Sequence, residues 1–199
     1  TPEHSFAMAA IAKAAALLPR DEQVWLLLAF LVGFGVKIPI FPLHGWLPLA
    51  HVEAPSPVSV LLSGVLLKMG AYGLLRVVGI LPEATVLLQP LLVGIALVSI
   101  LYGGLLAWRQ TDLKAMIAYS SVSHMGVVVL GISALNVIGL LGAVLQMIAH
   151  GLIAGALFLL IGLLYERTHT RELADYGSLV RVTPRFTFLI TLALLAGMG

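Results

Sequence analysis

Long apolar stretches recur along this chain and constrain its fold more than any other feature. A helix that crosses a bilayer needs about 20 mostly apolar residues. Five such stretches and the start of a sixth span residues 22–47 (interrupted), 57–80, 84–108, 112–134, 137–165 and 185–199. The chain is 60% hydrophobic and 10% charged, whereas soluble domains have about 45–50% apolar and about 25% charged residues. The sequence therefore predicts an all-α, polytopic transmembrane helix bundle that forms one domain over residues 1–199.

The first stretch contains a charge and helix breakers where a bilayer disfavours both. The segment GVKIPIFPLHGWLP, residues 35–48, includes Lys37, Pro39 and Pro42. Proline removes a backbone donor and breaks a helix, and a broken helix at membrane depth requires protein or water to satisfy the freed carbonyls. We therefore predict a discontinuous helix with a polar, hydrated break in which the Lys37 ammonium donates to those carbonyls. The alternative is a helix that simply ends near the interface, but the apolar residues after Lys37 argue against it.

The charged loops predict an orientation. Six basic residues gather on one side of the predicted bundle: Arg109, Lys114, Arg167, Arg171, Arg181 and Arg185. By the positive-inside rule that side faces the cytoplasm or its equivalent. Asp112 and Ser56 are placed to cap the helices that follow them. The chain does not start with methionine and its last residues are apolar, so we expect an internal piece of a larger protein.

Four ionisable residues lie inside the spans, and they are the candidate site residues: Lys37, Lys68, His124 and His150. Such groups are costly in hydrocarbon and usually mark ion or proton pathways. Lys68 lies half-way along its helix. Its stem of roughly 6 Å cannot reach the interface across a half-bilayer of about 15 Å, and no acidic residue in this chain lies at that depth. We expect Lys68 to face protein, water or a carboxylate from elsewhere.

The two histidines lie at similar depth on consecutive helices. Ser120 and Ser121 precede His124 by one turn and are expected to hold a water or fix the ring tautomer. Gln146 precedes His150 by one turn, and the Gly151-x-x-x-Gly155 pattern allows a close helix approach. Each histidine alone is equally compatible with a packing role.

The connection over residues 44–56 holds further polar residues. His44, His51 and Glu53 are expected to be solvated in an interfacial loop. Trp46 and Trp25 are expected to anchor the chain at the interface, where tryptophan is enriched.

Three classes of function differ in how many of these residues they explain. A proton relay explains all four, because histidine titrates near neutral pH and a nearby carboxylate can tune the proton affinity of a buried lysine. A haem protein would use His124 and His150 as axial ligands, but it leaves both lysines unexplained. A membrane scaffold gives no reason for ionisable residues within the spans, whose burial in hydrocarbon is unfavourable. The absence of cysteine excludes disulfides and any cysteine-held cluster or zinc within this chain.

Several long motifs resemble one known family. VKIPIFPLHGWLPLAHVEAPSPVSVLLSGVLLKMGAYGLLR, QTDLKAMIAYSSVSHMG, GAVLQMIAHGL and LYERTHTRELADYGSL are similar to the antiporter-like chain M, or chain 4, of NADH–quinone oxidoreductase (respiratory complex I). The resemblance implies a proton-translocating, non-redox membrane subunit. Lys37 matches the lysine of a broken helix, Lys68 the lysine of the next helix, and His124 and His150 the histidines of two later helices. The glutamates that partner them would lie outside this chain. One departure is Leu49, where the family commonly has an acid that a subunit contact would use.

The resemblance also implies the surroundings of the chain. It predicts no cofactor and no metal in this chain, with NADH, flavin, iron–sulfur clusters and quinone in or with partner subunits. The expected partners are other membrane subunits of complex I, especially chains L and N, and the lipid bilayer, with no nucleic acid. The expected location is a bacterial-type inner membrane, or a thylakoid or organelle inner membrane. Multisubunit sodium/proton antiporters and membrane-bound hydrogenases use similar subunits and are the alternatives.

Overall fold

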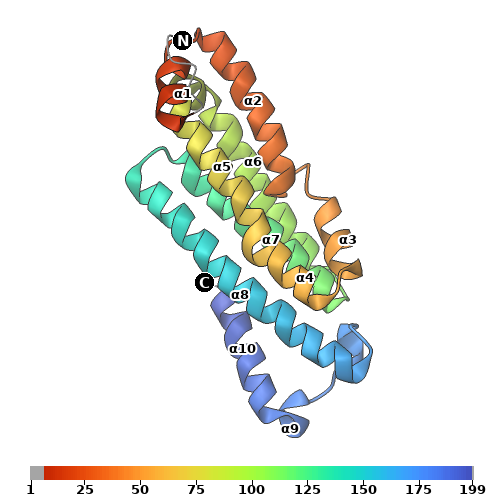
Figure 1. Cartoon of the computed structure of the whole chain (residues 1–199). Helices are drawn as coiled ribbons and strands as arrows, with labels where there is room; N and C mark the ends of the chain where they lie inside the picture. Colours follow the sequence, from red (N-terminus) through yellow and green to blue (C-terminus); the bar gives the residue numbers. More distant parts are fainter. Residues whose placement is uncertain (1–6, 199) are drawn as a thin grey trace.

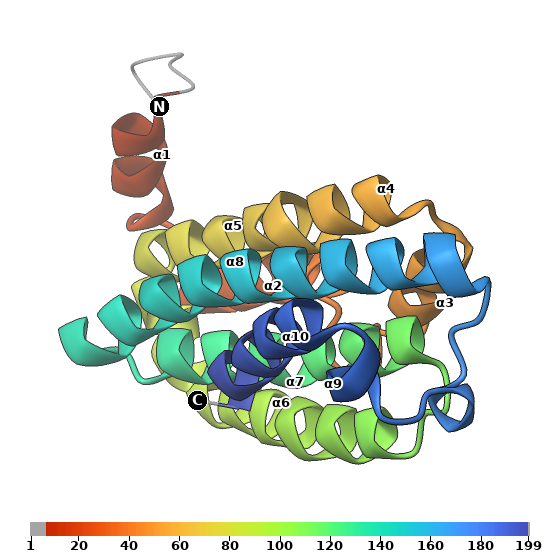
Figure 2. The ribbon, with the colours of Figure 1, turned by 90° about the horizontal axis from the view of Figure 1, so that it is seen from below.

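The computed structural model describes residues 7–198 as an all-helical bundle, as the sequence predicted (Figure 1). The elements are α1 (Met8–Ala15), α2 (Arg20–Lys37), α3 (Trp46–Glu53), α4 (Ser56–Leu61), the π turn η1 (Leu62–Leu66), α5 (Leu67–Ile80), α6 (Pro82–Trp108), α7 (Leu113–Ser133), α8 (Val137–Thr168), the 3₁₀ turn η2 (Leu173–Asp175), α9 (Leu179–Val182) and α10 (Pro184–Met198). Helices α2, α5, α6 and α7 pack side by side, α8 lies across α7 and the α4–η1 segment, and α10 packs on α8 (Figures 1 and 2).

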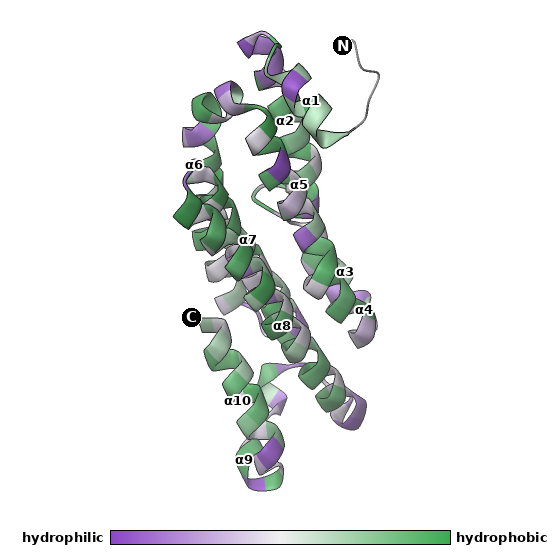
Figure 3. Cartoon of the chain, turned by 60° about the vertical axis from the view of Figure 1, so that its left-hand side comes forward, coloured by the Kyte–Doolittle hydropathy of each residue, from purple (hydrophilic) through white to green (hydrophobic). Residues whose placement is uncertain are grey.

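Within the described part of the chain, four helices are long and apolar enough to cross a membrane. They are Ser56–Ile80, Pro82–Trp108, Leu113–Ser133 and Val137–Thr168, which confirms the four middle stretches to within a few residues. Hydrophobic residues follow the lengths of these helices (Figure 3). The first predicted stretch is not among the four because α2 carries charged residues at both ends, among them Arg20 and Lys37. The last predicted stretch is not among the four either, because α10 covers only 15 residues.

The predicted break in the first stretch is present between Lys37, the last residue of α2, and Trp46, the first of α3. Two of its freed carbonyls are satisfied without Lys37. The Ile40 amide donates to the Gly35 carbonyl at 3.1 Å, and the Trp46 indole donates to the Val36 carbonyl at 2.9 Å. Lys37 makes no hydrogen bond to any described residue. The prediction that Lys37 serves these carbonyls is therefore wrong, because the indole reaches back across the break and takes that place.

Two helix crossings depend on glycine. At the crossing of α6 and α7, a Cβ on Gly103 would lie 2.8 Å from the Ser123 backbone nitrogen. At the crossing of α8 and the π turn, a Cβ on Gly151 would lie 3.0 Å from the Gly64 carbonyl oxygen. Backbones approach this closely only where small residues face each other, which confirms the close approach predicted for the glycine pattern in α8.

The helix ends show one predicted cap and one that was missed. Asp112 caps α7, as predicted, because its Oδ1 accepts the Ala115 amide at 2.9 Å. Ser56 does not cap: it is the first residue of α4, and its predecessor Pro55 makes no side-chain cap. Asn136 provides the other cap, because its Oδ1 accepts the Gly139 amide at the start of α8 at 2.7 Å.

Candidate functional site

Lys68 lies at the centre of a polar cluster between α5 and α8. Its ammonium lies 2.7 Å from His150 Nδ1 and also donates to the Ser63 carbonyl. His150 is only 4% exposed. The structure thus places two predicted site residues, 82 positions apart, in direct contact within the bundle.

The π turn η1 provides the second of these acceptors. The Leu67 amide donates to the Leu62 carbonyl, five residues earlier, whereas in an α-helix it would donate to the carbonyl four residues earlier, that of Ser63. The Ser63 carbonyl is thereby left for the Lys68 ammonium. Single π turns inside α-helices are frequent at functional sites, and here the turn gives a buried cation a backbone partner.

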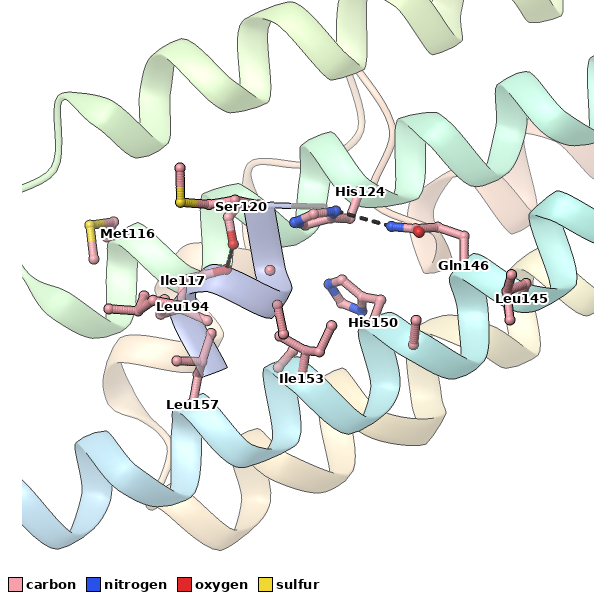
Figure 4. A pocket seen from close by; sticks show the side chains of 15 residues that line it. Met116, Ile117, Ser120, His124, Leu145, Gln146, His150, Ile153, Leu157 and Leu194 are labelled. Carbon is pink, nitrogen blue, oxygen red and sulfur yellow. Dashed lines mark hydrogen bonds between the residues drawn. The ribbon is translucent and has the colours of Figure 1, made fainter. Parts of the chain in front are cut away.

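His124 joins the cluster from α7. Its ring centroid lies 5.3 Å from that of His150 with a tilt of 54°, and its Nδ1 lies 3.1 Å from Gln146 Nε2 (Figure 4). The sequence predicts Gln146 beside His150, but the structure places its side chain against His124.

The two serines before His124 make no hydrogen bond to its ring among the described residues. The Ser120 and Ser121 hydroxyls donate to the Ile117 carbonyl at 2.8 and 3.1 Å. Neither hydroxyl therefore fixes the ring tautomer through a direct hydrogen bond, while the expectation that the serines hold a water stays a prediction. Serine in a helix commonly bonds the backbone one turn earlier, and this local partner takes the hydroxyls.

A cavity of about 460 Å³ opens beside the two histidines. It lies between α7, α8 and α10, and Figure 4 shows His124, Gln146 and His150 along one side of it with apolar side chains around them. The His150 Nε2 and Ser63 Oγ atoms are buried without a hydrogen-bond partner among the described residues. Buried polar atoms of this kind are usually satisfied by ordered water, and the cavity is large enough to hold several molecules.

Lys37 stands apart from this cluster. It is half-buried and lines a groove with Phe34 and Gly70, and a Cβ on Gly70 would lie 2.8 Å from Lys37 Cβ. Gly70 follows Lys68 by two residues, which is about 200° around a helix. Lys37 therefore packs on the opposite face of α5 from the Lys68 cluster.

The structure buries a residue that the sequence predicts to be solvated. His51 is fully buried, and its ring stacks on Phe158 of α8 at 4.4 Å and 8°. Neither ring nitrogen has a partner among the described residues. Burial, and next the nearby Lys114 ammonium, lower the His51 pKa to about 4. The expectation of solvation is wrong because α3 folds back against α7 and α8.

His44 is also buried rather than solvated. Its ring lies 5.9 Å from Phe41 and 5.4 Å from Tyr102, and desolvation lowers its pKa. Glu53 is exposed, as expected. His44 and His51 are seven residues apart, a spacing that places two side chains on one face of a helical segment, and this spacing was the available signal that both turn inward.

The fold and the cluster define an α-helical, multi-pass membrane protein with ionisable groups in contact inside the bundle. A family model described as NADH:quinone oxidoreductase/Mrp antiporter, TM, matches residues 4–199. The chain belongs to this family, which confirms the resemblance noted from its motifs.

Individual relatives agree with the family. NAD(P)H-quinone oxidoreductase chain 4 1 of Synechococcus sp. (strain JA-2-3B'a(2-13)) is 54% identical over 172 residues, which cover 86% of this chain and 33% of that protein. The chain spans about a third of the length of the curated relatives it matches.

Two solved structures extend the likeness to the fold. A chain of respiratory complex I from Thermus thermophilus with bound NADH matches with a TM-score of 0.87 and 35% identity, over 98% of this chain and 45% of that one. A chain of the membrane-bound sulfane sulfur reductase, an archaeal respiratory membrane complex, matches with a TM-score of 0.85 and 28% identity, over 92% and 39%.

Proposed function

We propose that this chain moves protons across the membrane as a non-redox part of an NAD(P)H–quinone oxidoreductase, with Lys68, His150 and His124 as the relay. The observation that carries the proposal is the 2.7 Å contact between the Lys68 ammonium and His150 Nδ1. A proton donor and an acceptor at this distance are within direct transfer range. The contact lies inside helices that are long enough to span the membrane.

The contact also assigns a direction to the hydrogen bond. An ammonium group has donors and no acceptor, so His150 Nδ1 accepts and its proton resides on Nε2. That Nε2 is buried without a partner among the described residues. A proton that passes from Lys68 to Nδ1 can therefore leave from Nε2, provided that a water in the adjoining cavity accepts it. His124, whose ring centroid is 5.3 Å away, is the next side chain that can accept and release a proton.

Lys37 is proposed as a second lysine of the pathway, on the far side of α5. The single ion pair among the described residues joins Arg171 and Asp112, so neither Lys37 nor Lys68 has a carboxylate partner within them. A mobile carboxylate changes the proton affinity of a buried lysine. We therefore infer that acidic residues in another part of the longer protein, or in a neighbouring subunit, partner these lysines.

The same proposal covers partners and cofactors. The chain is expected to act as one transmembrane domain of a longer subunit, beside chains L and N and other membrane subunits of the complex. NADH, flavin, iron–sulfur clusters and quinone would be bound in or with partner subunits, and this chain would hold no cofactor or metal.

Replacement of Lys68 by methionine tests the proposal. The full-length protein is assembled in its complex in sealed vesicles, and quinone reduction and proton uptake are recorded together. We expect Lys68→Met to lower both, since a coupled pump cannot turn over without proton transfer. Lys13→Met, which removes an exposed lysine from α1, is the control and should leave both unchanged.

Two results would contradict the proposal. Unchanged turnover and proton uptake in a fully assembled Lys68→Met complex would exclude Lys68 from the pathway. Ion movement that requires sodium and continues without any electron donor would instead favour an antiporter, the alternative within the same family.

A further inference from the structure

Two basic side chains from distant parts of the chain hold the C-terminal end of α3. Arg171 Nη1 donates to the Val52 carbonyl at 2.7 Å, across 119 residues of sequence. Lys114 Nζ donates to the Ala54 carbonyl at 2.7 Å. The last carbonyls of a helix have no intrahelical donor and carry partial negative charge. Both cations therefore satisfy acceptors that the eight-residue helix α3 leaves free.

Arg171 connects α3 to two further elements through the same guanidinium group. Its Nε lies 3.1 Å from Asp112 Oδ2 at the start of α7, and its Cζ lies 5.3 Å from the ring centre of Tyr165 near the end of α8. The Arg171 carbonyl also accepts the Leu113 amide at 3.0 Å. A planar guanidinium can serve two acceptors at once in a fixed fork, which the single nitrogen of lysine does not reproduce.

The helix end held by Arg171 separates solvent from a buried site. Glu53, the last residue of α3, is exposed, whereas His51 and Ser59 are 0% exposed. The Ser59 hydroxyl donates to the His51 carbonyl at 3.4 Å, and the His51 ring stacks on Phe158. If the end of α3 lifted from α8, these groups would meet water.

We propose that Arg171 is a positioning residue that holds α3 against the bundle, as a latch, and keeps the buried pair His51 and Ser59 closed to the aqueous phase. Arg171 belongs to the six basic residues predicted to lie on one side of the membrane, which we call the arginine-rich side. The latch therefore closes the bundle on that side. The inference concerns access to the site and is independent of which ion the protein moves.

A cysteine reporter tests the latch. The chain contains no cysteine, so Ser59→Cys introduces a single thiol into it with little change in volume. The full-length protein is assembled in its complex in vesicles, and a small membrane-impermeant methanethiosulfonate is added on the arginine-rich side. Labelling is expected to be slow with Arg171 present. With Arg171→Gln it should be about tenfold faster or more, because loss of a hydrogen bond from a charged group shifts an opening equilibrium by about that factor.

Matched controls separate the latch from a loss of charge or of general stability. Arg167→Gln removes a neighbouring exposed charge that makes no hydrogen bond to the described residues, and it should label at the parent rate. A second reporter, Ser133→Cys, lies fully buried at the other end of α7. It should remain unlabelled in Arg171→Gln if only the end of α3 has opened.

A milder variant keeps the test decisive if Arg171→Gln fails to assemble. Asp112→Asn retains a side-chain oxygen to cap Ala115 but removes the charge that faces Arg171, and its Ser59 reporter should label at an intermediate rate. Equal Ser59 labelling in Arg171→Gln and Arg167→Gln would overturn the proposal. A parallel rise in labelling at the Ser133 reporter would also overturn it, because it would indicate that the whole bundle had loosened. If Asp112→Asn is the only variant that assembles, Ser59 labelling at the parent rate in that variant would overturn the proposal.

Discussion

Replacement of Gly151 by alanine tests whether the close approach of α8 to the π turn keeps the polar cluster together. The added Cβ would lie 3.0 Å from the Gly64 carbonyl oxygen and 3.6 Å from Lys68 Cε. The first of these contacts is too short by a few tenths of an ångström. Because the Gly64 oxygen belongs to the backbone, it can move only if the π turn or α8 moves with it. The contact between Lys68 and His150 spans the same crossing, so it must lengthen as well.

The expected cost follows from the two opposing effects of the methyl group. Overpacking of this kind costs about 1–3 kcal/mol, while alanine gains up to about 1 kcal/mol over glycine in helix propensity. Gly142 provides a matched control on the same helix, because a Cβ there would meet no atom within 4 Å. Gly142→Ala keeps the propensity gain without the clash. The two variants should therefore differ by about 1–3 kcal/mol.

The assay is thermal denaturation of the purified complex in one detergent, together with proton uptake in vesicles. Gly151→Ala should have a denaturation midpoint a few degrees below that of Gly142→Ala, and it should show reduced proton uptake. A midpoint equal to or above that of Gly142→Ala would refute the reasoning, since it would show that the crossing has room for a methyl group.

Two further predictions concern the break and its short helix. The His51 pKa is lowered from 6.5 to about 4 in the folded chain. Between these pH values the unfolded chain therefore binds a proton that the folded chain does not. The free energy of unfolding then falls by up to about 3 kcal/mol as the pH drops through this window. His51→Phe should flatten the pH dependence of the denaturation midpoint over that range, and an unchanged slope would show that another group is responsible. Trp46→Phe removes the donor to the Val36 carbonyl and should cost about 1 kcal/mol, measured as a lower midpoint than that of Trp25→Phe, whose exposed indole makes no hydrogen bond to a described residue.

The features that could be predicted from the sequence are those that depend on the length of apolar stretches and on the energetic cost of a buried charge. The four long apolar helices, the break after Lys37 and the similar depth of His124 and His150 all followed from those two quantities. Contacts that depend on helix rotation did not follow. Helices α7 and α8 are apolar on most sides, so periodicity does not set which face points inward, and Gln146 was paired with His150 instead of His124.

The remaining differences arise from tertiary contacts and from backbone register. The sequence predicts a solvated His51 because its segment is short, whereas packing against Phe158 of α8 buries it. The opposite placement of Lys37 and Lys68 about α5 depends on where the chain re-enters the bundle after the break. The π turn leaves no periodic signal in five residues, so the link between Lys68 and the Ser63 carbonyl was not visible.

The π turn also has a consequence for comparing this chain with its relatives. Because each bond of the turn closes over five residues rather than four, the segment from Ser56 to Lys68 holds one residue more than a regular helix with the same two ends. A relative that lacks the turn should show a one-residue gap between these positions in an alignment. In such a relative the lysine would be rotated by about 100° on its helix, away from the histidine it contacts here. The length of this segment is therefore a marker, readable without any structure, of whether a homologue has kept the contact.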